Sequence, residues 1–318
     1  LGDVYKRQVV VVLHNGSPVE LPWADRVSAI LEMYLGGQGV GEACDWLLFG
    51  EANPSGRLAE TFPYRLEDNP SFLHFPGNEK RVLYGEDIFV GYRYYDTKKV
   101  PVRYAFGHGL SYTEFTYGDL TLSSAQMTDE DILTVSLKVK NSGKTEGKEV
   151  VQLYVADLCG TPERPVKELK GFAKVHLLPG EEKTVSMEIS ARDLSYYEER
   201  LGDWYAPSGT YRILIGHASD DIRLHADIVF KTKKKLPLRV DFTTTFGELL
   251  DHTKTAPVIT ELLAPLAAAA ASAEGMSDEY KKLGEQVIRE MPLKFLLGQM
   301  PGEQVEQLIG QLNCLLAQ

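Results

Sequence analysis

In the segment from Asp131 to Lys140, DILTVSLKVK, apolar and polar residues alternate strictly from Leu133 onwards. Strict alternation places the apolar side chains on one face of an extended strand, so that face must be buried against another sheet. Further apolar segments follow, separated by turn residues such as those of 179–181 and 207–209. These segments are Val150–Val155, Phe172–Leu177, Thr184–Ile189, Gly209–Ile215 and Asp221–Phe230. Short strands at this spacing predict an antiparallel β-sandwich.

The N-terminal part has a different pattern. Val9–Leu13 is an unbroken apolar run, which is typical of a strand buried on both faces of a parallel sheet. A helix is predicted to begin at Pro22–Asp25, because apolar residues follow at helical spacing, namely Val27, Ile30, Leu31 and Tyr34. The turn Gly36–Gly41 precedes a second predicted helix through Ala43–Leu48. This order of elements predicts an α/β layer.

The C-terminal part shows only helical spacing. Lys231–Lys235, KTKKK, is a basic break that we interpret as a linker. Apolar residues then recur at helical intervals in 249–266, 283–288 and 305–315, with Ser277 as the predicted cap of the middle helix. These segments predict amphipathic helices that dock on protein.

The chain is therefore predicted to be a multi-domain protein that combines α/β and all-β structure. Residues 1–8, LGDVYKRQ, do not lead naturally into the following strand, and we expect a non-native leader there. The expected domains are an α/β region, a β-sandwich, and a linker with a helical tail. Their expected boundaries are 9–115, 116–230 and 231–318.

Composition excludes some classes of partner and site. The 45 acidic and 34 basic residues give a net charge of −11, which argues against nucleic acid and anionic membranes as partners. Cys44, Cys159 and Cys314 are far apart and form no CxxC pair, so we expect neither a disulfide framework nor a metal site. These cysteines favour a reducing, cytoplasmic compartment, although the sequence leaves secretion open.

The most distinctive segment is Tyr84–Tyr117, in which tyrosines and phenylalanines surround the turn Phe106–Ser111, FGHGLS. It closely resembles the end of the α/β sandwich domain in β-glucosidase-type glycoside hydrolases of family 3. Other segments match the same family, with Gly36 where its members usually have proline. They are Pro18–Glu20, Gly37–Gln38, Asn53–Leu58 and Thr61–Pro63, and, resembling its fibronectin type III-like domain, Glu149–Val155, Arg164–Phe172 and Leu178–Glu181.

The resemblance covers roughly residues 9–230. It implies that 9–115 form the C-terminal half of the family's α/β sandwich domain and that 116–230 form its fibronectin type III-like domain. It also implies a retaining enzyme that hydrolyses terminal β-linked sugars. In the family the nucleophile is an aspartate of a TIM-barrel domain, and the acid/base is a glutamate upstream of the segment matching Val9–Leu13. The resemblance thus implies that this chain contains no catalytic residue, needs no metal or organic cofactor, and is inactive alone. It implies as partners an oligosaccharide or β-glucoside substrate and the TIM-barrel domain, and it leaves open a second copy in a homodimer. The alternative is a non-catalytic carbohydrate-binding or scaffold module.

Glu86 and Asp87 are paired carboxylates, the groups that a glycosidase needs. Adjacent residues on an extended chain point to opposite faces, so this pair cannot flank one glycosidic bond, and we interpret both as structural. We interpret Arg93 as a buried hydrogen-bonding anchor and His108 as a turn histidine hydrogen-bonded to the backbone.

His14, Ser17 and Asp25 suggest a catalytic triad at first sight. No GxSxG elbow is present and their order is wrong for a hydrolase triad, so we do not expect serine chemistry. Asn15-Gly16-Ser17 matches a glycosylation sequon, but a turn is the expected structure.

Two further features have competing interpretations. Gly36–Gly41 could form a phosphate-binding loop, but a dinucleotide fold needs its glycines directly after the first strand. A predicted helix separates them from Leu13, so we favour a role in helix–sheet packing. Tyr196, Tyr197 and Trp204 could form a platform that stacks on sugar rings, but we favour the core of the sandwich.

Overall fold

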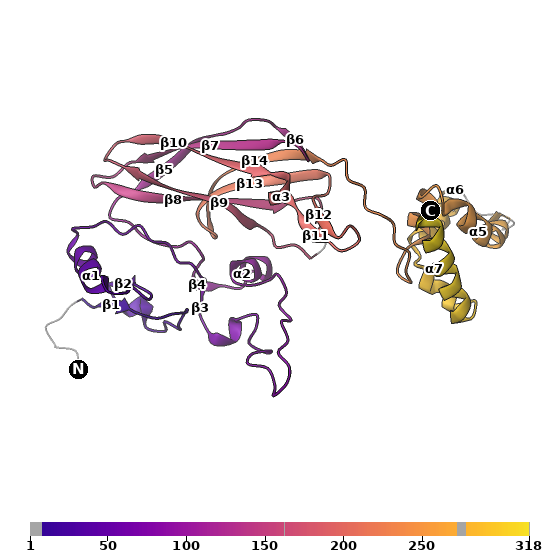
Figure 1. Ribbon diagram of the computed structural model, residues 1–318, viewed down its shortest axis with the longest axis horizontal. Coiled ribbons are helices and arrows are strands. Elements are labelled where there is room, and N and C mark those ends of the chain that lie inside the picture. The colour runs from indigo at the N-terminus through magenta and orange to yellow at the C-terminus, as the bar shows by residue number, and fades with distance from the viewer. Residues whose placement is uncertain (1–7, 162, 272–277, 318) are drawn as a thin grey trace. The chain divides into compact units, whose positions relative to one another are not determined.

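The computed structural model describes residues 8–161, 163–271 and 278–317 (Figure 1). These residues fall into two compact units. The first unit extends to Tyr197 and resumes over Trp204–Lys234. The second unit comprises Glu198–Asp203 and the chain from Lys235 onwards. We describe each unit by itself.

A β-sandwich forms the larger part of the first unit, as the sequence predicts. One sheet has the strand order β10-β7-β5, and the other has the order β6-β14-β13-β8-β9. The strands of the first sheet are β5 (Phe115–Leu122), β7 (Ile132–Asn141) and β10 (Glu182–Ser190). Those of the second sheet are β6 (Gln126–Thr128), β8 (Gly147–Asp157), β9 (Glu168–Leu177), β13 (Gly209–Ala218) and β14 (Asp221–Lys231). All neighbouring strands are antiparallel except β6 and β14.

The core of the sandwich lies between the two sheets. Alternation buries Leu133, Val135, Leu137 and Val139 of β7, which face apolar residues of the second sheet such as Val151 and Ile213. Helix α3 (Ala191–Leu194) and the small sheet of β11 (Tyr196–Glu198) and β12 (Asp203–Tyr205) follow β10. At about 25 cal/mol per Å² of apolar surface, this interior is the main source of stability in the first unit.

The N-terminal region begins with a pair of parallel strands. β1 (Val10–Leu13) pairs with β2 (Ala29–Glu32), and the 3-10 helix η1 (Ala24–Arg26) lies between them. The helix predicted to follow Pro22–Asp25 is therefore wrong beyond η1. A short apolar run such as that of β2 fits both the helical and the strand periodicity. Pairing with β1 selects the extended conformation here.

The rest of this region contains both predicted and unpredicted elements. Helix α1 (Val40–Phe49) forms where the second helix is predicted, and it ends at the left-handed Gly50. β3 (Phe62–Pro63) pairs with β4 (Val102–Tyr104), after which the chain turns into the sandwich. The 3-10 helix η2 (Leu66–Asp68) and helix α2 (Tyr92–Lys98) were not predicted.

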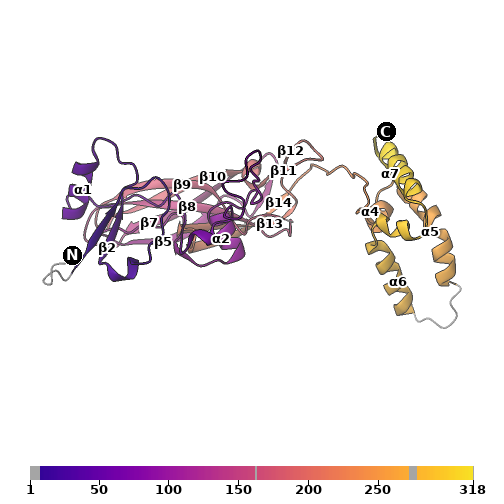
Figure 2. The same ribbon diagram turned by 90° about the horizontal axis from the view of Figure 1, so that it is seen from below.

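The second unit is a helical bundle with its own core (Figure 2). Its helices are α4 (Phe246–Asp251), α5 (Ala256–Ala271), α6 (Asp278–Glu290), η3 (Leu293–Gly298) and α7 (Gly302–Ala317). The core buries Phe246, Leu249, Ile259, Val305 and Leu312, so the predicted docking of amphipathic helices on protein is confirmed within this unit. Thr245 caps α4, and Glu248 completes a capping box.

Some predictions concern parts of the chain that the structure does not test. The predicted leader, apart from Gln8, and the predicted cap Ser277 lie outside the described residues. The boundaries at 115, 116, 230 and 231 remain predictions. In the part of the chain that the structure describes, no helix is both long and apolar enough to cross a membrane.

Candidate functional site: a buried polar cluster between the N-terminal region and the sandwich

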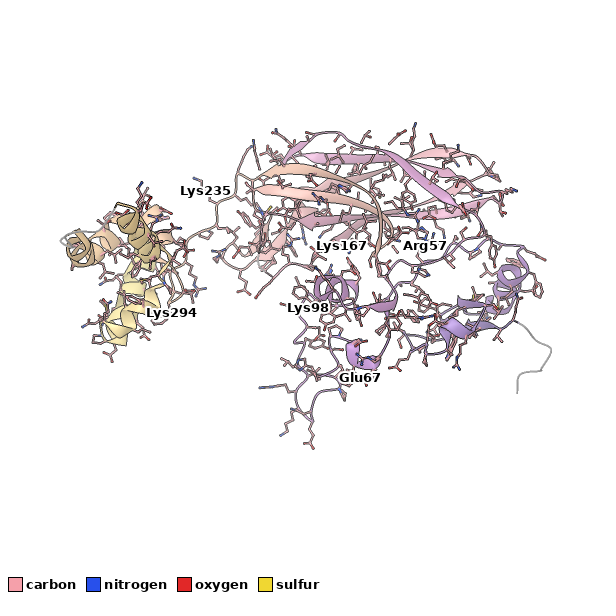
Figure 3. The ribbon with its side chains drawn as sticks, turned by 180° about the vertical axis from the view of Figure 1, so that it is seen from behind. Arg57, Glu67, Lys98, Lys167, Lys235 and Lys294 are labelled. Carbon is pink, nitrogen blue, oxygen red and sulfur yellow. The ribbon has the colours of Figure 1, made fainter. Side chains whose placement is uncertain are left out.

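A buried carboxylate joins the N-terminal region to the sandwich. The side chain of Glu149, on β8, has no exposed surface. Its Oε2 accepts a hydrogen bond from Arg57 Nη2 at 2.7 Å, and its Oε1 accepts one from the Tyr117 hydroxyl at 2.7 Å. Arg57 comes from the turn after α1, and its side chain is 6% exposed. Figure 3 shows Arg57 on the side of the sandwich that faces the N-terminal region.

His217, at the end of β13, completes this cluster. Its Nδ1 lies 2.6 Å from Glu149 Oε1, and its Nε2 lies 2.9 Å from the carbonyl oxygen of Gly109. Both partners are oxygen acceptors, so a ring that carries a proton on each nitrogen donates to both. His217 thereby links the sandwich to the turn that contains Gly109.

The protonation equilibria of the cluster follow from this geometry. Burial alone would raise the pKa of Glu149, but the hydrogen bond from His217 and the charge of Arg57 outweigh burial and lower it. Burial and the neighbouring Glu149 charge raise the pKa of Tyr117. Because both oxygens of Glu149 are engaged, this carboxylate is held in place and cannot act as a free general base.

Two turns of the N-terminal region fit closely against this cluster. A Cβ atom on Gly109 would lie 2.6 Å from the Gly56 carbonyl oxygen, so only glycine fits there without movement. Asn53 Nδ2 donates to the Glu146 carbonyl at 2.8 Å, while Asn53 Oδ1 accepts from the Tyr112 amide at 2.8 Å. The segments 53–58 and 106–112 therefore act as the connection to the sandwich.

A second charged cluster forms where α2 meets the loop before β9. Arg164 Nη2 donates to Glu168 Oε2 at 2.7 Å, and Arg93 Nη2 lies 3.3 Å from Glu168 Oε1. Lys167 Nζ lies 2.7 Å from Asp96 Oδ2. Burial raises the pKa of Asp96, whereas the pKa of Glu168 is lowered because the charges of nearby lysine and arginine outweigh burial.

The structure does not assemble Glu86 and Asp87 into a catalytic pair. They lie in the turn that precedes α2, and Asp87 has a positive φ of 49°, so the prediction of an extended chain is wrong here. Asp87 is exposed, whereas Oε2 of Glu86 is buried without a hydrogen-bond partner among the described residues. The structural interpretation of both residues stays a prediction.

The apparent triad is not brought together either. Asp25 forms a two-pronged ion pair with Arg103, at 2.6 and 2.8 Å, and this pairing lowers the pKa of Asp25. His14 and Ser17 are exposed. Asn15 Nδ2 donates to the Ser17 carbonyl at 2.8 Å, which confirms the predicted turn.

Arg93 and His108 differ in part from their predicted roles. Arg93 pairs with Glu168 and keeps about a third of its side chain exposed, so it is an anchor at the edge of the interface. The His108 ring stacks on Tyr104 with centroids 5.0 Å apart, and its backbone carbonyl accepts from the Leu58 amide at 2.9 Å. His108 is therefore a turn histidine held by ring stacking and by backbone hydrogen bonds.

The three aromatic residues near β11 and β12 do not all belong to the sandwich core. Tyr197 and Trp204 are exposed, so the interpretation as core is wrong for these two residues. Their rings meet edge to face at 5.6 Å, and the Arg192 guanidinium lies 3.1 Å from the Trp204 ring centroid. Tyr196 is partly buried and meets Tyr205 edge to face.

The glycine-rich segment Gly36–Gly41 follows β2, and its last two residues, Val40 and Gly41, begin α1. A strand, rather than the predicted helix, separates it from Leu13. A Cβ atom on Gly36 would meet the Val40 side chain, which supports a packing role at this position. Over residues 8–161, 163–271 and 278–317, no group of three histidine, cysteine or acidic residues could hold a metal ion.

Comparison with known proteins identifies the two parts that meet at the cluster. Residues 3–112 match the model of the glycosyl hydrolase family 3 C-terminal domain, and residues 149–219 match that of the fibronectin type III-like domain. The chain belongs to glycosyl hydrolase family 3. Arg57 and Gly109 thus lie in the family's C-terminal domain, whereas Glu149 and His217 lie in its fibronectin type III-like domain.

Relatives in this family share much of the chain. Thermostable β-glucosidase B from Acetivibrio thermocellus is 45% identical over 309 residues, which are 96% of this chain and 40% of that protein. A β-glucosidase from Kluyveromyces marxianus is 46% identical over 229 residues, 71% of this chain and 26% of that protein. This chain thus spans less than half the length of these two relatives.

Solved structures of β-glucosidases are also similar to this chain. The crystal structure of the Kluyveromyces marxianus β-glucosidase in complex with glucose has a TM-score of 0.66 at 42% identity, over 70% of this chain and 26% of that one. The family 3 β-glucosidase of Bifidobacterium adolescentis has a TM-score of 0.71 at 39% identity, over 79% of this chain and 37% of that one.

Sequence reasoning missed the roles of the residues that form the buried cluster. A signal for Glu149 was present, because alternation along β8 places it on the same buried face as Val151 and Leu153. A charged residue at an inward position needs a buried partner. His217 carried no such signal, because its partners Glu149 and Gly109 are 68 and 108 residues away.

Proposed function

We propose that this chain is the C-terminal portion of a retaining β-glucosidase-like enzyme that acts on terminal β-linked sugars. The observation that carries the proposal is the 45% identity to a β-glucosidase over 96% of the chain. Such an enzyme uses a carboxylate nucleophile and a carboxylate acid/base, and it forms a covalent glycosyl-enzyme intermediate. In this proposal, both carboxylates belong to the part of the parent protein that corresponds to the unmatched length of the relatives.

The chain itself acts as a rigid support in this proposal. Glu149 forms hydrogen bonds with Arg57, Tyr117 and His217. We therefore assign this carboxylate a structural role. We propose that the chain divides into domains after residues 115 and 230, and that all three parts support the catalytic portion. The parent enzyme needs no metal or organic cofactor, because two carboxylates suffice for glycoside hydrolysis.

A chimeric enzyme tests the proposal. Residues 9–318 would replace the matching segment of the Acetivibrio thermocellus β-glucosidase B, and hydrolysis of an aryl β-glucoside would be measured. We expect the chimera to hydrolyse this substrate and the 318-residue chain alone to show no turnover, since losing both carboxylates removes an acceleration of about 10⁶-fold or more. A folded but inactive chimera would contradict the proposal, and so would turnover by the chain alone.

A non-catalytic carbohydrate-binding module is the second candidate. The exposure of Tyr197 and Trp204 favours it, because exposed aromatic rings with a polar tip are suited to recognition surfaces. Titration of the chain with cello-oligosaccharides, monitored by tryptophan fluorescence, tests this candidate. Saturable binding that Trp204→Ala abolishes and Trp46→Ala preserves would support the module.

A further inference from the structure

An apolar hairpin extends from the N-terminal region over residues 72–85, and we call it the finger. Figure 1 shows this part of the chain as a purple loop that extends away from the sheets of the sandwich. Six of its large apolar residues are exposed: Phe72, Leu73, Phe75, Val82, Leu83 and Tyr84. Leu73, Tyr84 and Phe75 are 86%, 78% and 75% exposed. An apolar cluster of this kind on a surface marks an interaction site.

The backbone of the finger holds these side chains together. The amide of Asn78 donates to the Arg81 carbonyl at 3.0 Å, and the amide of Arg81 donates back at 3.3 Å. A Cβ atom on Gly77 would lie 2.5 Å from the Arg81 carbonyl oxygen, and one on Gly85 would lie 2.7 Å from His74 Nε2. The two arms are therefore in contact, and their apolar residues form one surface.

The surface is hollowed rather than flat. A hollow of about 380 Å³ lies between the arms and is lined by Leu73, His74, Phe75, Arg81 and Leu83. The tip carries Glu79 beside Lys80 and Arg81, so both signs of charge are present. Apolar walls with a mixed-charge rim suit a protein surface better than a polyanion or a free sugar.

We propose that the finger is the docking surface for the catalytic portion of the parent enzyme, an inference that rests on the proposed function. The Acetivibrio thermocellus and Kluyveromyces marxianus relatives have 60% and 74% of their length outside the match to this chain. The remaining length of such a protein is large enough to cover the finger. The occupant is thus an apolar surface of the same polypeptide, which accepts Leu73, Phe75 and Tyr84.

Amide hydrogen exchange tests the docking without relying on activity. Exchange over 72–85 would be compared between the 318-residue chain and the chimera with the Acetivibrio thermocellus catalytic portion. We expect exchange in the chimera to be slower by about tenfold or more, because docking excludes water from the finger. Equal exchange rates in the two proteins would overturn the proposal.

Substitutions give a second measurement. The variant Leu73→Ser/Phe75→Ser/Tyr84→Ser should leave the melting temperature of the chain alone unchanged and shorten the half-life of the chimera at elevated temperature by about tenfold. The control Ile132→Ser/Phe172→Ser removes exposed apolar residues from the sandwich and should change neither protein. Equal effects of the finger and control variants on the chimera would overturn the proposal.

Two further outcomes separate the alternatives. If the chimera does not fold, the tagged chain and the catalytic portion would be co-expressed. We expect the two proteins to co-purify and the finger variant alone to abolish this co-purification. Co-purification that persists with the finger variant would overturn the proposal. If the chain alone dimerises through the finger while the finger exchanges freely in the chimera, a second copy is the occupant and the proposal is wrong. A protected finger in an inactive chimera would support docking and contradict the proposed activity.

Discussion

Arg57 and Glu149 form a buried ion pair, with Arg57 Nη2 2.7 Å from Glu149 Oε2, although 92 residues separate them in the sequence. The pair joins a turn of the family 3 C-terminal domain to a strand of the fibronectin type III-like domain. Because the side chains are 6% and 0% exposed, neither charge can be hydrated if the other is removed. The two domains are therefore coupled energetically at this point.

Replacement of Glu149 should strongly destabilise the first unit. Glu149→Gln leaves the Arg57 charge buried without a carboxylate, and removal of one partner of a buried pair costs about 3–5 kcal/mol. Urea unfolding of the variant measures the loss in the free energy of unfolding. The matched control is Glu130→Gln, because Glu130 pairs with Lys233 on the surface and such pairs contribute about 0–1 kcal/mol. Equal losses for both variants would contradict the structural role of Glu149.

Replacement of both partners should cost less than the two single substitutions together. Arg57→Met/Glu149→Met removes both charges of the ion pair and leaves apolar side chains of similar length, so neither partner is left buried without the other. A double-mutant cycle by urea unfolding measures the coupling between the two side chains. Additive losses would show that the ion pair carries no coupling.

Acid should destabilise the first unit through Glu149 and Glu168. The pKa of each carboxyl is lowered in the folded state, so each stabilises the fold above the unfolded-state value of about 4.3. This stabilisation is lost as the pH falls through the lower folded-state pKa. Asp96 opposes the trend, because its pKa is raised. Melting temperatures between pH 3 and 6 should fall towards acid, and Glu168→Gln should flatten the curve.

The start of the chain should be the part most open to proteolysis. Val9 and Val10 are exposed at the start of the short parallel pair β1–β2, and α1 exposes Trp46 and Phe49. The core beneath them is small, with only Leu21, Ala24 and Phe62 buried in that cluster among the described residues. Limited digestion should remove residues before about 112 first and leave the sandwich. Survival of the N-terminal third while the sandwich is digested would contradict the domain interpretation.

The helical tail should show protected amides. Residues 257–266 and 305–315 lie in α5 and α7, which pack around Ile259, Val305 and Leu312. Leu312→Ala should reduce the stability of the tail by about 2–5 kcal/mol, because it leaves a cavity in a buried position. Hydrogen exchange resolved by residue measures this loss. Exchange at the unstructured rate in the unmodified chain would contradict the packing.

The sandwich could be predicted from the sequence because its strands carry their own pattern. In β7, alternation alone indicates that Leu133, Val135, Leu137 and Val139 face inward. The β2 segment could not be predicted in this way, because its apolar residues also fit a helix and the strand depends on β1. Helix α2 was not predicted, because its tyrosines favour strands. The helix is bounded by Gly91 and Lys99, which both adopt a positive φ.

The buried cluster could be predicted only in part. The segments around Arg57, Gly109 and Glu149 resemble family motifs in the sequence. That these three residues lie close together depends on the packing of two domains. His217 contributes by bonding to Glu149 and to the Gly109 carbonyl, which are 68 and 108 residues away in the sequence. A backbone carbonyl leaves no trace in residue identity.

The separate core of the helical tail has a consequence for the history of the gene. Between Lys231, the end of β14, and Leu238, the first residue that packs on the tail core, a recombination event would break neither hydrophobic core. Such an appendage can be acquired or discarded whole by genes of one family. A 309-residue match to one relative beside a 229-residue match to another is the pattern that this exchange would leave.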